Sequence, residues 1–393
     1  MEAALRVNAD PEAHRAGSDV DGGYFLYHSI GLYPGKAAEM AAATACFAAL
    51  WGAEDDGQWP ATLALRAEFL AHWSALIGAP KGTLTTAESV TAALHAAFRA
   101  LPSEQLADRR VLVAADCFPS LHFLLAGLAE RMGFRLETVP LRPGFAWVPE
   151  EDLLARWGPD VALALLTLVT STASFRADLP ALLAHGRAMD SLVALDLTQG
   201  VGIVPFRMGE AGPDIVVSTS LKWLCGAPGA GVLALRPELL AECRPELRGW
   251  FSQPDPFCWD LDRFDYAPDA RRFDAGTPAP LAAIASVPAL RWHAAQDRAA
   301  LLAHTRRLSA AILDGAADLG LETASPTDPE RRGGSVALRL PETADPGTVV
   351  DGLRAARVFA DARGPLLRLS PGAVTTEAGL GRLIRTLAPL VRR

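Results

Sequence analysis

The sequence predicts an α/β protein with a large domain, whose mostly parallel sheet is sandwiched by helices, and a small α+β domain at the C-terminal end. Short apolar or β-branched runs alternate with helical stretches from about residue 82 to residue 240. A long helical stretch follows, and after it come two strand candidates and two helices. Alternation of strands and helices along a chain is typical of parallel sheets with helices on both faces.

The strands expected in the large domain are all short and apolar. Ligands of parallel sheets bind beyond the C-terminal ends of the strands, so we expect the functional residues to follow strands. We predict strands at 111–115, 135–139, 161–167, 192–195, 215–218 and 231–235, with helices between them that include 120–132 and 179–189.

Apolar residues recur at helical spacing in segments 35–51 and 61–77, so we expect a helix in each. The linking helix is expected to begin near Pro278 and run toward Leu313, with a break or kink at Pro288. The small domain is expected to contain strands 335–340 and 366–369 and helices 348–356 and 376–390. We therefore predict an N-terminal arm and part of the small domain at 1–50, the large domain at 51–280, and the linking helix with the small domain at 281–393.

Composition and charge exclude several classes of protein. The net charge is -8 and no basic stripe is interleaved with aromatic residues, so we expect no nucleic-acid partner. No apolar run approaches the roughly 20 residues of a membrane helix. The first residues lack the pattern of a secretion signal, so we expect a cytoplasmic protein without a membrane partner. The five cysteines form no CxxC pair and no zinc-ligand cluster, so we expect no metal site.

Lysine is rare in this chain. Lys36, Lys81 and Lys222 are the only lysines among 37 basic residues. A guanidinium stays protonated, whereas a lysine amine can become neutral and attack a carbonyl carbon. Because arginine supplies almost all of the positive charge, each lysine is a candidate for chemistry that arginine cannot do.

Three features in sequence order form a candidate site. Asp196 ends an apolar strand, where a buried carboxylate needs a partner such as a protonated pyridine nitrogen. Lys222 follows the hydroxyl-rich stretch 218–220 and has apolar neighbours, and a glycine-rich turn at 226–231 precedes the next strand. That turn matches neither the dinucleotide-binding nor the P-loop fingerprint. The alternatives are a helix N-cap for Asp196 and a surface position for Lys222, and the apolar neighbours of Lys222 argue against the second.

The run 196–235 resembles the class V aminotransferase superfamily of fold-type I enzymes, which use pyridoxal 5′-phosphate (PLP). It contains an Asp-x-x-Gln motif, a serine-rich stretch, the lysine and a glycine-rich turn. Over residues 24–390 the chain is similar to the kynureninases of this superfamily. The segments that carry this similarity are 24–34, 116–120, 247–251, 272–278 and 366–370.

The resemblance implies a role for each matching residue around the cofactor ring. Lys222 would hold PLP as a Schiff base and later carry the α-proton of the substrate. Asp196 would pair with the pyridine nitrogen. Gln199 would hydrogen-bond the phenolic oxygen, and Phe118 would stack on the ring.

For the phosphate group, the resemblance implies contacts from Ser220 and, at a helix start, from Ser89 and Thr91. Trp250 and Thr277 would reach the phosphate from the other subunit of a homodimer with a shared active site. The alternatives are core packing for Trp250 and a helix N-cap for Thr277.

The resemblance places the substrate contacts on the small domain. Arg368 would bind the α-carboxylate of a small amino acid with two hydrogen bonds, which fixes the Cα–H bond relative to the ring. His28 is a further candidate for the substrate pocket. The alternatives are a structural ion pair for Arg368, a loop residue without function for His28, and core packing for Phe118.

The chain departs from the kynureninase pattern at four positions. Leu221 replaces the tyrosine before the lysine, and Gln199 replaces a histidine. Leu121 replaces an aspartate, and Glu88 places a carboxylate near the phosphate position. A cysteine desulfurase is disfavoured because no cysteine follows Cys258.

The resemblance implies a PLP-dependent enzyme that cleaves the side chain of a small amino acid, in the manner of a hydrolase or lyase of specialised metabolism. A class V aminotransferase and an epimerase-like enzyme are alternatives. A PLP-fold scaffold without activity is the alternative that is not an enzyme.

Overall fold

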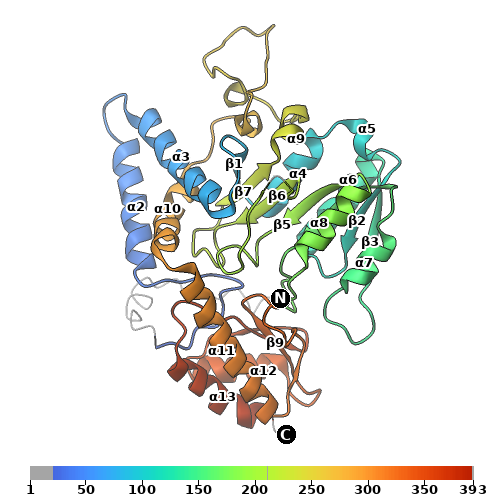
Figure 1. Cartoon of the computed structure of the whole chain (residues 1–393). Helices are drawn as coiled ribbons and strands as arrows, with labels where there is room; N and C mark the ends of the chain where they lie inside the picture. The colour runs from blue at the N-terminus through green and yellow to red at the C-terminus, as the bar shows by residue number, and fades with distance from the viewer. Residues whose placement is uncertain (1–20, 210, 392–393) are drawn as a thin grey trace.

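The computed structural model describes residues 21–209 and 211–391 and contains two β-sheets. The large domain has a seven-stranded sheet of order β1-β7-β6-β5-β4-β2-β3. The small domain has a four-stranded antiparallel sheet of order β10-β11-β9-β8. In Figure 1 the large sheet lies in the upper part of the molecule and the small domain lies below it.

Strands β2 to β6 of the large sheet run parallel, and β7 is antiparallel to both neighbours, β6 and β1. This arrangement confirms the predicted mostly parallel sheet. Strand β1 is missing from the prediction because its four residues include two threonines and no apolar run. The bounds are β1 Leu84–Ala87, β2 Arg110–Ala114, β3 Arg135–Val139, β4 Val161–Thr167, β5 Leu192–Asp196, β6 Ile215–Thr219, β7 Gly231–Leu235, β8 Glu322–Thr323, β9 Val336–Arg339, β10 Asp361–Arg363 and β11 Leu366–Leu369.

Helices cover both faces of the large sheet because successive strand residues point to opposite sides. In β4, Ala164 and Leu166 pack in a core with α3, α7, α8 and α10. Leu163 and Leu165 of the same strand pack in a second core with α4, α6 and α9. The bounds are α3 Gln58–Ile77, α4 Val90–Ala100, α5 Ser103–Leu106, α6 Pro119–Met132, α7 Glu150–Arg156, α8 Leu179–Ala188, α9 Pro237–Glu242 and α10 Leu281–Ala295.

Of the predicted break or kink at Pro288, the break is wrong. Helix α10 continues through Pro288, and a separate helix, α11, covers Arg298–Asp318. Asp297 is the N-cap of α11, where its Oδ1 accepts hydrogen bonds from two backbone N–H groups of the first turn. The capping aspartate, rather than the proline, therefore sets the boundary between the two helices.

The small domain packs α11, α12 (Pro346–Ala355) and α13 (Glu377–Val391) against its sheet around a core of its own. Phe25 of the N-terminal segment is buried in this core, and its backbone pairs with Phe359 and Ser370. The domain boundaries at 50/51 and 280/281 stay predictions. The first 20 residues of the predicted arm lie outside the described residues.

Within residues 21–209 and 211–391, no helix has the length and apolar character needed to span a bilayer. In the same part of the chain, no group of three or more histidine, cysteine or acidic residues is placed to hold a metal ion. The cytoplasmic location stays a prediction.

Candidate active site

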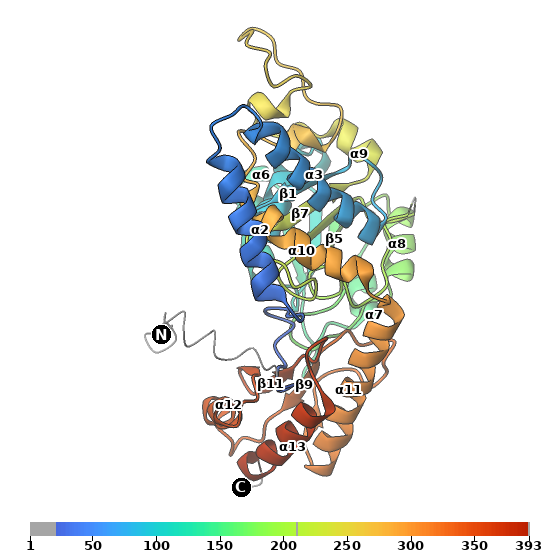
Figure 2. The same ribbon diagram turned by 90° about the vertical axis from the view of Figure 1, so that its left-hand side faces the viewer.

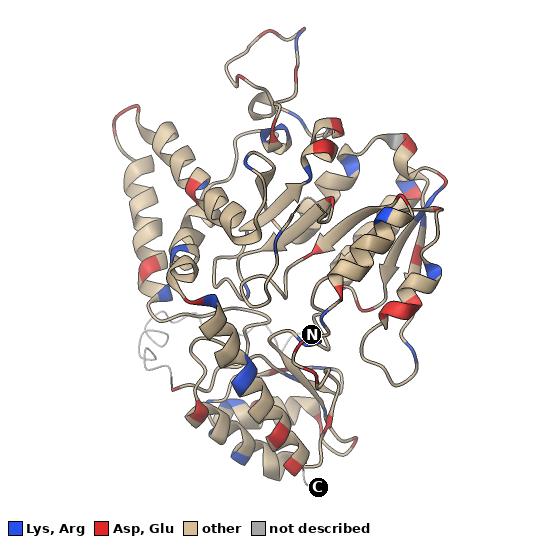
Figure 3. Cartoon of the chain, viewed as in Figure 1, with Lys and Arg blue, Asp and Glu red and all other residues tan. Residues whose placement is uncertain are grey.

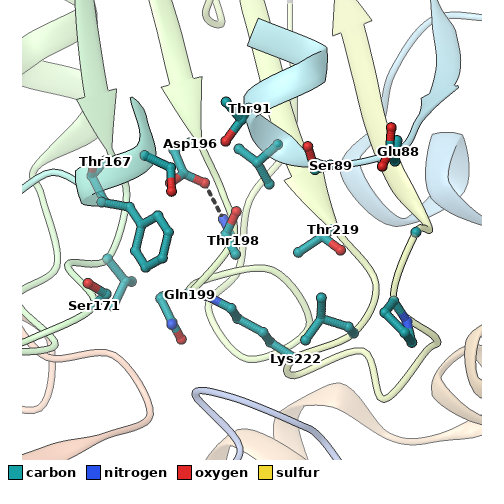
Figure 4. Close-up of a pocket in the computed structure, with 17 residues that line it drawn as sticks. Glu88, Ser89, Thr91, Thr167, Ser171, Asp196, Thr198, Gln199, Thr219 and Lys222 are labelled. Atoms are coloured by element: carbon teal, nitrogen blue, oxygen red, sulfur yellow. Dashed lines mark hydrogen bonds between the residues drawn. The ribbon is translucent and has the colours of Figure 1, made fainter. Parts of the chain in front are cut away.

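A cavity of about 400 Å³ lies where the parallel strands end. Its residues follow β2, β4, β5 and β6 at their C-terminal ends, the edge at which sheets of this kind bind ligands. A cavity of this size can enclose a cofactor together with a small substrate. Six predicted site residues line it: Lys222, Asp196, Gln199, Phe118, Ser89 and Thr91. Figure 4 shows five of its polar residues around one common space: Asp196, Thr198, Gln199, Thr219 and Lys222.

Asp196 is the last residue of β5, and it is buried. Its Oδ1 accepts a hydrogen bond of 2.8 Å from the backbone N–H of Thr198. Burial raises the pKa of this carboxyl group, and hydrogen bonding to Thr198 and the charge of Lys222 counter that rise only in part. No cation of the described residues forms an ion pair with Asp196. The carboxylate therefore lines the cavity with capacity for a positively charged partner.

Lys222 lies in the loop after β6, and its amine is 5.2 Å from the centroid of the Phe118 ring. Burial lowers the pKa of the amine to about 8. The charge of Asp196 acts in the opposite direction, and the charges of Arg368 and Arg363 lower the pKa further. An amine with this pKa is partly neutral near physiological pH, the form that attacks a carbonyl carbon.

The amide of Gln199 has a fixed orientation. Trp223 donates a hydrogen bond from Nε1 to Oε1 of Gln199 (3.1 Å), and Nε2 of Gln199 donates to the carbonyl oxygen of His28 (2.9 Å). An indole N–H only donates and a carbonyl oxygen only accepts, so these partners determine which amide atom is which. The second N–H of Gln199 is left for an acceptor in the cavity.

The N-terminus of α4 lines the cavity with hydroxyl and backbone N–H groups. Ser89 is the N-cap of this helix, and its Oγ accepts a hydrogen bond of 3.1 Å from the backbone N–H of Ala92. The O–H of Ser89 can still donate to a ligand. Thr91 and Thr219 add two more hydroxyl groups. A helix N-terminus with such donors binds anions, and phosphate among them.

Ser220 does not line the cavity of its own chain, whereas the resemblance implied a contact with the phosphate group. Ser220 is fully buried, and its Oγ accepts a hydrogen bond of 3.0 Å from the indole N–H of Trp73. Thr219, the residue before it, lines the cavity instead. Consecutive residues of an extended segment point to opposite sides, so only one of these two hydroxyl groups can face the cavity.

Two of the residues that depart from the kynureninase pattern also line the cavity. Glu88 precedes the N-cap Ser89 and is exposed, and Leu221 precedes Lys222. A carboxylate is favourable at a helix N-terminus, but it repels a phosphate held by the same N–H groups. Glu88 therefore competes electrostatically with a phosphate, and Leu221 supplies no hydrogen bond.

Arg368 and His28 lie beside the cavity rather than among the residues that line it. Asp361 forms a bidentate ion pair with Arg368, with one contact of 3.0 Å from Nε to Oδ1 and another from Nη2 to Oδ2. Arg368 also donates from Nη1 to the backbone oxygen of Ser171 (3.0 Å), and Ser171 does line the cavity. Of the five N–H groups of a guanidinium, these contacts leave two for a ligand.

His28 belongs to the same polar cluster. Its Nε2 is 3.0 Å from Oδ1 of Asp361, and its Nδ1 is 2.6 Å from the hydroxyl oxygen of Ser370. Burial lowers the pKa of the imidazole, and the hydrogen bond to Asp361 opposes that shift. The position of His28 fits the support of Arg368 through Asp361 better than direct contact with a ligand.

Trp250 and Thr277 do not line the cavity of their own chain. Trp250 begins the short 3-10 helix η2 (Trp250–Ser252) and packs edge-to-face on Trp59 and Phe251. Thr277 is exposed. Their contribution to the phosphate site of a partner subunit stays a proposal.

The sequence prediction misses Asp361 as well as Thr219. Asp361 lies directly opposite Arg368 in the antiparallel pair of β10 and β11. Gly364-Pro365 marks the turn of this hairpin, and an acidic residue opposite a basic one is a common cross-strand pair. Those two signals favour a hairpin here, but the register that sets Asp361 opposite Arg368 comes from the structure.

Residues 69–360 match the family model described as aminotransferase class-V. The chain belongs to this family. It is 29% identical over 356 residues to a kynureninase of Deinococcus radiodurans, a match that covers 84% of this chain and 82% of that protein. It is also 29% identical over 344 residues to the isopenicillin N epimerase of Streptomyces clavuligerus, with coverage of 84% and 85%.

The fold also matches solved structures. One is a lysine-to-alanine mutant of C-DES with glycine covalently linked to the PLP cofactor, with a TM-score of 0.84 at 19% identity. The match covers 97% of this chain and 100% of that chain. An identity this low shows the fold alone, and it confirms the predicted fold-type I architecture.

The residues of the cavity fit PLP. They combine a buried carboxylate without a cation partner, a lysine amine of lowered pKa, and hydroxyl groups at a helix N-terminus. Together with family membership, this fit confirms the predicted cofactor, and the chain is a PLP-dependent enzyme. A scaffold without activity is not supported.

Borohydride reduction of the purified protein should attach the cofactor irreversibly to Lys222. With only three lysines in the chain, peptide mapping of the reduced protein identifies the modified residue directly. Lys222→Ala should abolish the visible absorbance band that borohydride removes, and Lys81→Ala, at an exposed position, should retain it. A borohydride-sensitive band in the Lys222→Ala protein would contradict the assignment.

In cofactor-free protein, the reactivity of Lys222 should rise with pH and reach half its maximum at about pH 8. Burial favours the neutral amine, which is the reactive form, so the midpoint lies below the 10.5 of an ordinary lysine. Methylation of Lys222 by formaldehyde and borohydride, followed by mass spectrometry, measures the profile. Asp196→Asn should move the midpoint further down because the carboxylate stabilises the charged amine. A wild-type midpoint near 10.5 would refute the lowered pKa.

Proposed function

We propose that this enzyme cleaves the side chain of a small amino acid, as a hydrolase or lyase. The observation that carries the proposal is the placement of Lys222 and Asp196 in one cavity, after the neighbouring strands β6 and β5. Placement on opposite sides of the sheet would have left the two groups without a common ligand. A small amino acid as substrate is consistent with the family.

Each lining side chain has a role that follows from its position in the cavity. When bound, PLP supplies an electron sink for charge that develops at the Cα atom of the substrate. Asp196 would hold the pyridine nitrogen of a bound cofactor, because a buried carboxylate stabilises a positive charge beside it. Lys222 would accept the Cα proton of the substrate and return it, since an amine of pKa about 8 can do both near neutral pH. Gln199 lines the cavity and would offer its second amide N–H to the ligand, and Phe118 lies beside the Lys222 amine.

The choice of reaction rests on the lining of the cavity and on the relatives. Glu88, Asp196 and Lys222 are the only ionisable side chains among the described lining residues. Asp196 is assigned to the ring nitrogen, and Glu88 precedes the helix that would hold the phosphate. A two-base epimerase needs a second acid or base on the far face of the substrate, so the lining favours reactions that use Lys222 alone. Side-chain cleavage and transamination both meet that condition, and similarity to kynureninases favours cleavage.

A homodimer with a shared active site is part of the proposal. Helix α2 (Lys36–Trp51) carries charge only at Lys36 and Glu39, yet none of its residues is buried within the single chain. Figure 3 shows it as an almost uncharged helix at the edge of the molecule. A helix that is apolar nearly all round is normally covered. We propose that a second copy of the chain covers it, in a cytoplasmic enzyme.

Incubation with a panel of amino acids should distinguish the reactions. A substrate will first change the visible spectrum of the bound cofactor. Mass spectrometry should then detect a fragment that contains the side-chain carbons, together with alanine or pyruvate. Lys222→Ala should produce neither compound. A 2-oxo acid that retains the whole side chain would instead identify an aminotransferase, and an inverted but intact amino acid would identify an epimerase.

Sedimentation equilibrium should give twice the chain mass of 41.6 kDa. Ala45→Glu, at an exposed position of α2, should shift the protein toward the monomer because it places a charge in the proposed interface. Ala310→Glu, at an exposed position of α11, is the matched control and should leave the dimer intact. A wild-type protein that sediments as a monomer would exclude the shared site.

A further inference from the structure

A second cavity, of about 590 Å³, lies on the small domain and shares no lining residue with the active site. Helix α11 forms one wall through residues spaced three or four apart between Arg306 and Ala317, the spacing of a single helix face. Leu321, β8 and the loop 327–332 form the other wall. Figure 2 shows α11 along one side of the small domain, next to β9. We call this space the α11 cavity.

Arg332 lines the α11 cavity, although only 4% of its surface is exposed. Its Nη1 donates hydrogen bonds to the backbone oxygens of Pro326 (2.5 Å) and Thr327 (2.9 Å). Its Nε has no acceptor among the described residues, and its Nη2 forms no hydrogen bond with them. Three of the five N–H groups of this guanidinium are therefore without a partner in that part of the chain.

The other buried arginines are better satisfied, as the cost of burying a cation requires. Arg66 and Arg368 each form a bidentate ion pair with an aspartate. Arg272 donates four hydrogen bonds to backbone oxygens. Arg332 has neither an ion pair nor a full set of backbone acceptors among the described residues. Its charge is thus available to an anion in the α11 cavity.

The neighbouring charges leave Arg332 as the cation to be matched. Arg306 forms an ion pair of 2.7 Å with Glu330, which also pairs with Arg176. Burial and the charge of Arg306 lower the pKa of Arg332. The charge of the exposed Asp328 opposes that shift only in part, without forming an ion pair with Arg332. One carboxylate in the cavity would supply the missing acceptors and the missing charge.

The rest of the lining selects the body of the ligand. Leu313, Leu321 and three alanines make most of it apolar. Asp314 is exposed and also lines the cavity, where it repels a second negative charge. Ligand cavities of this size are typically apolar, with a few polar groups that fix the orientation of the ligand. The ligand that fits is therefore a monocarboxylate with an apolar chain or ring.

The backbone at Arg332 leads from the α11 cavity to the active site. It pairs with the backbone of Phe175 in the large domain. Two residues further on, Gly334 packs so closely on Trp223 that a Cβ atom there would lie 2.3 Å from the indole ring. The same indole donates its hydrogen bond to Gln199 in the active site. A shift of this segment would therefore press on the side chain that orients Gln199.

We propose that the α11 cavity is a second ligand site, which binds a monocarboxylate with an apolar body through Arg332 and transmits its occupancy to the active site through residues 332–334. This site is independent of the reaction proposed above. A charge-assisted bond to a guanidinium is the strong form of carboxylate recognition, and burial strengthens it because less water screens it.

Calorimetric titrations of the cofactor-loaded enzyme with 4-phenylbutanoate and with 4-phenylbutanamide test the site. The two probes share an apolar body and differ in the carboxylate. The wild type should bind the carboxylate roughly 10- to 100-fold more tightly than the amide, and Arg332→Gln should remove that difference. Equal affinities in the wild type, or a difference that survives in Arg332→Gln, would overturn the role of Arg332. A wild type that binds neither probe would overturn the site.

The variant Ala317→Glu tests where the probe binds. Ala317 is an exposed residue of α11 that lines the cavity, so the new carboxylate repels the probe. This variant should lose roughly 10-fold or more in affinity for 4-phenylbutanoate. Ala303→Glu makes the same change at an exposed position of α11 outside the cavity lining and should leave the affinity unchanged. Both variants keep Arg332, so the comparison holds even where Arg332→Gln fails to fold. Unaltered binding in Ala317→Glu would overturn the site.

The visible spectrum of the bound cofactor tests the connection to the active site. Saturating 4-phenylbutanoate should change the absorbance band in the wild type and in Ala303→Glu, and leave it unchanged in Ala317→Glu. Binding in the α11 cavity without a change of the band would overturn the connection alone. A change that persists in Ala317→Glu would assign the effect to the active site itself and would overturn the connection as well.

Discussion

The burial of a carboxylate beside an amine at the ends of neighbouring parallel strands is the constraint on which the site depends. Asp196 ends β5, and Lys222 follows β6, the next strand in the sheet. Both groups are shifted by burial toward their neutral forms. The bond from Thr198 and the charge of Lys222 offset part of the cost of burying the carboxylate, and a positively charged partner in the cavity would offset more. The site is therefore organised for a ligand that brings a cationic ring nitrogen and a carbonyl carbon.

The two domains contribute different chemistry to this site. The large domain supplies the strand ends, the N-terminus of α4 and the fixed amide of Gln199. The small domain supplies the ion pair of Asp361 and Arg368, and Arg368 contacts the large domain through the backbone oxygen of Ser171. The two parts are held by separate hydrophobic cores, so relaxation of either core would change the distance between them.

Two lining residues set the charge and polarity of the cavity beside Asp196 and Lys222. Glu88 adds negative charge where the N-terminus of α4 offers donors, and Leu221 places an apolar side chain directly before Lys222. On the small-domain side, Asp361 and Arg368 form an ion pair that contacts the backbone of Ser171, a lining residue.

The sequence by itself determined the fold class and most of the strands, because both depend on local periodicity. Its resemblance to the class V aminotransferases, in a motif within residues 196–235, implied the cofactor and singled out Lys222 and Asp196. Only the tertiary structure decided that Thr219 lines the cavity and Ser220 does not. Neighbouring residues of an extended segment point to opposite sides, so a shift of one residue exchanges their contacts. It also decided that Asp361 neutralises Arg368, because such a pair depends on strand register, which amino-acid identity alone leaves open.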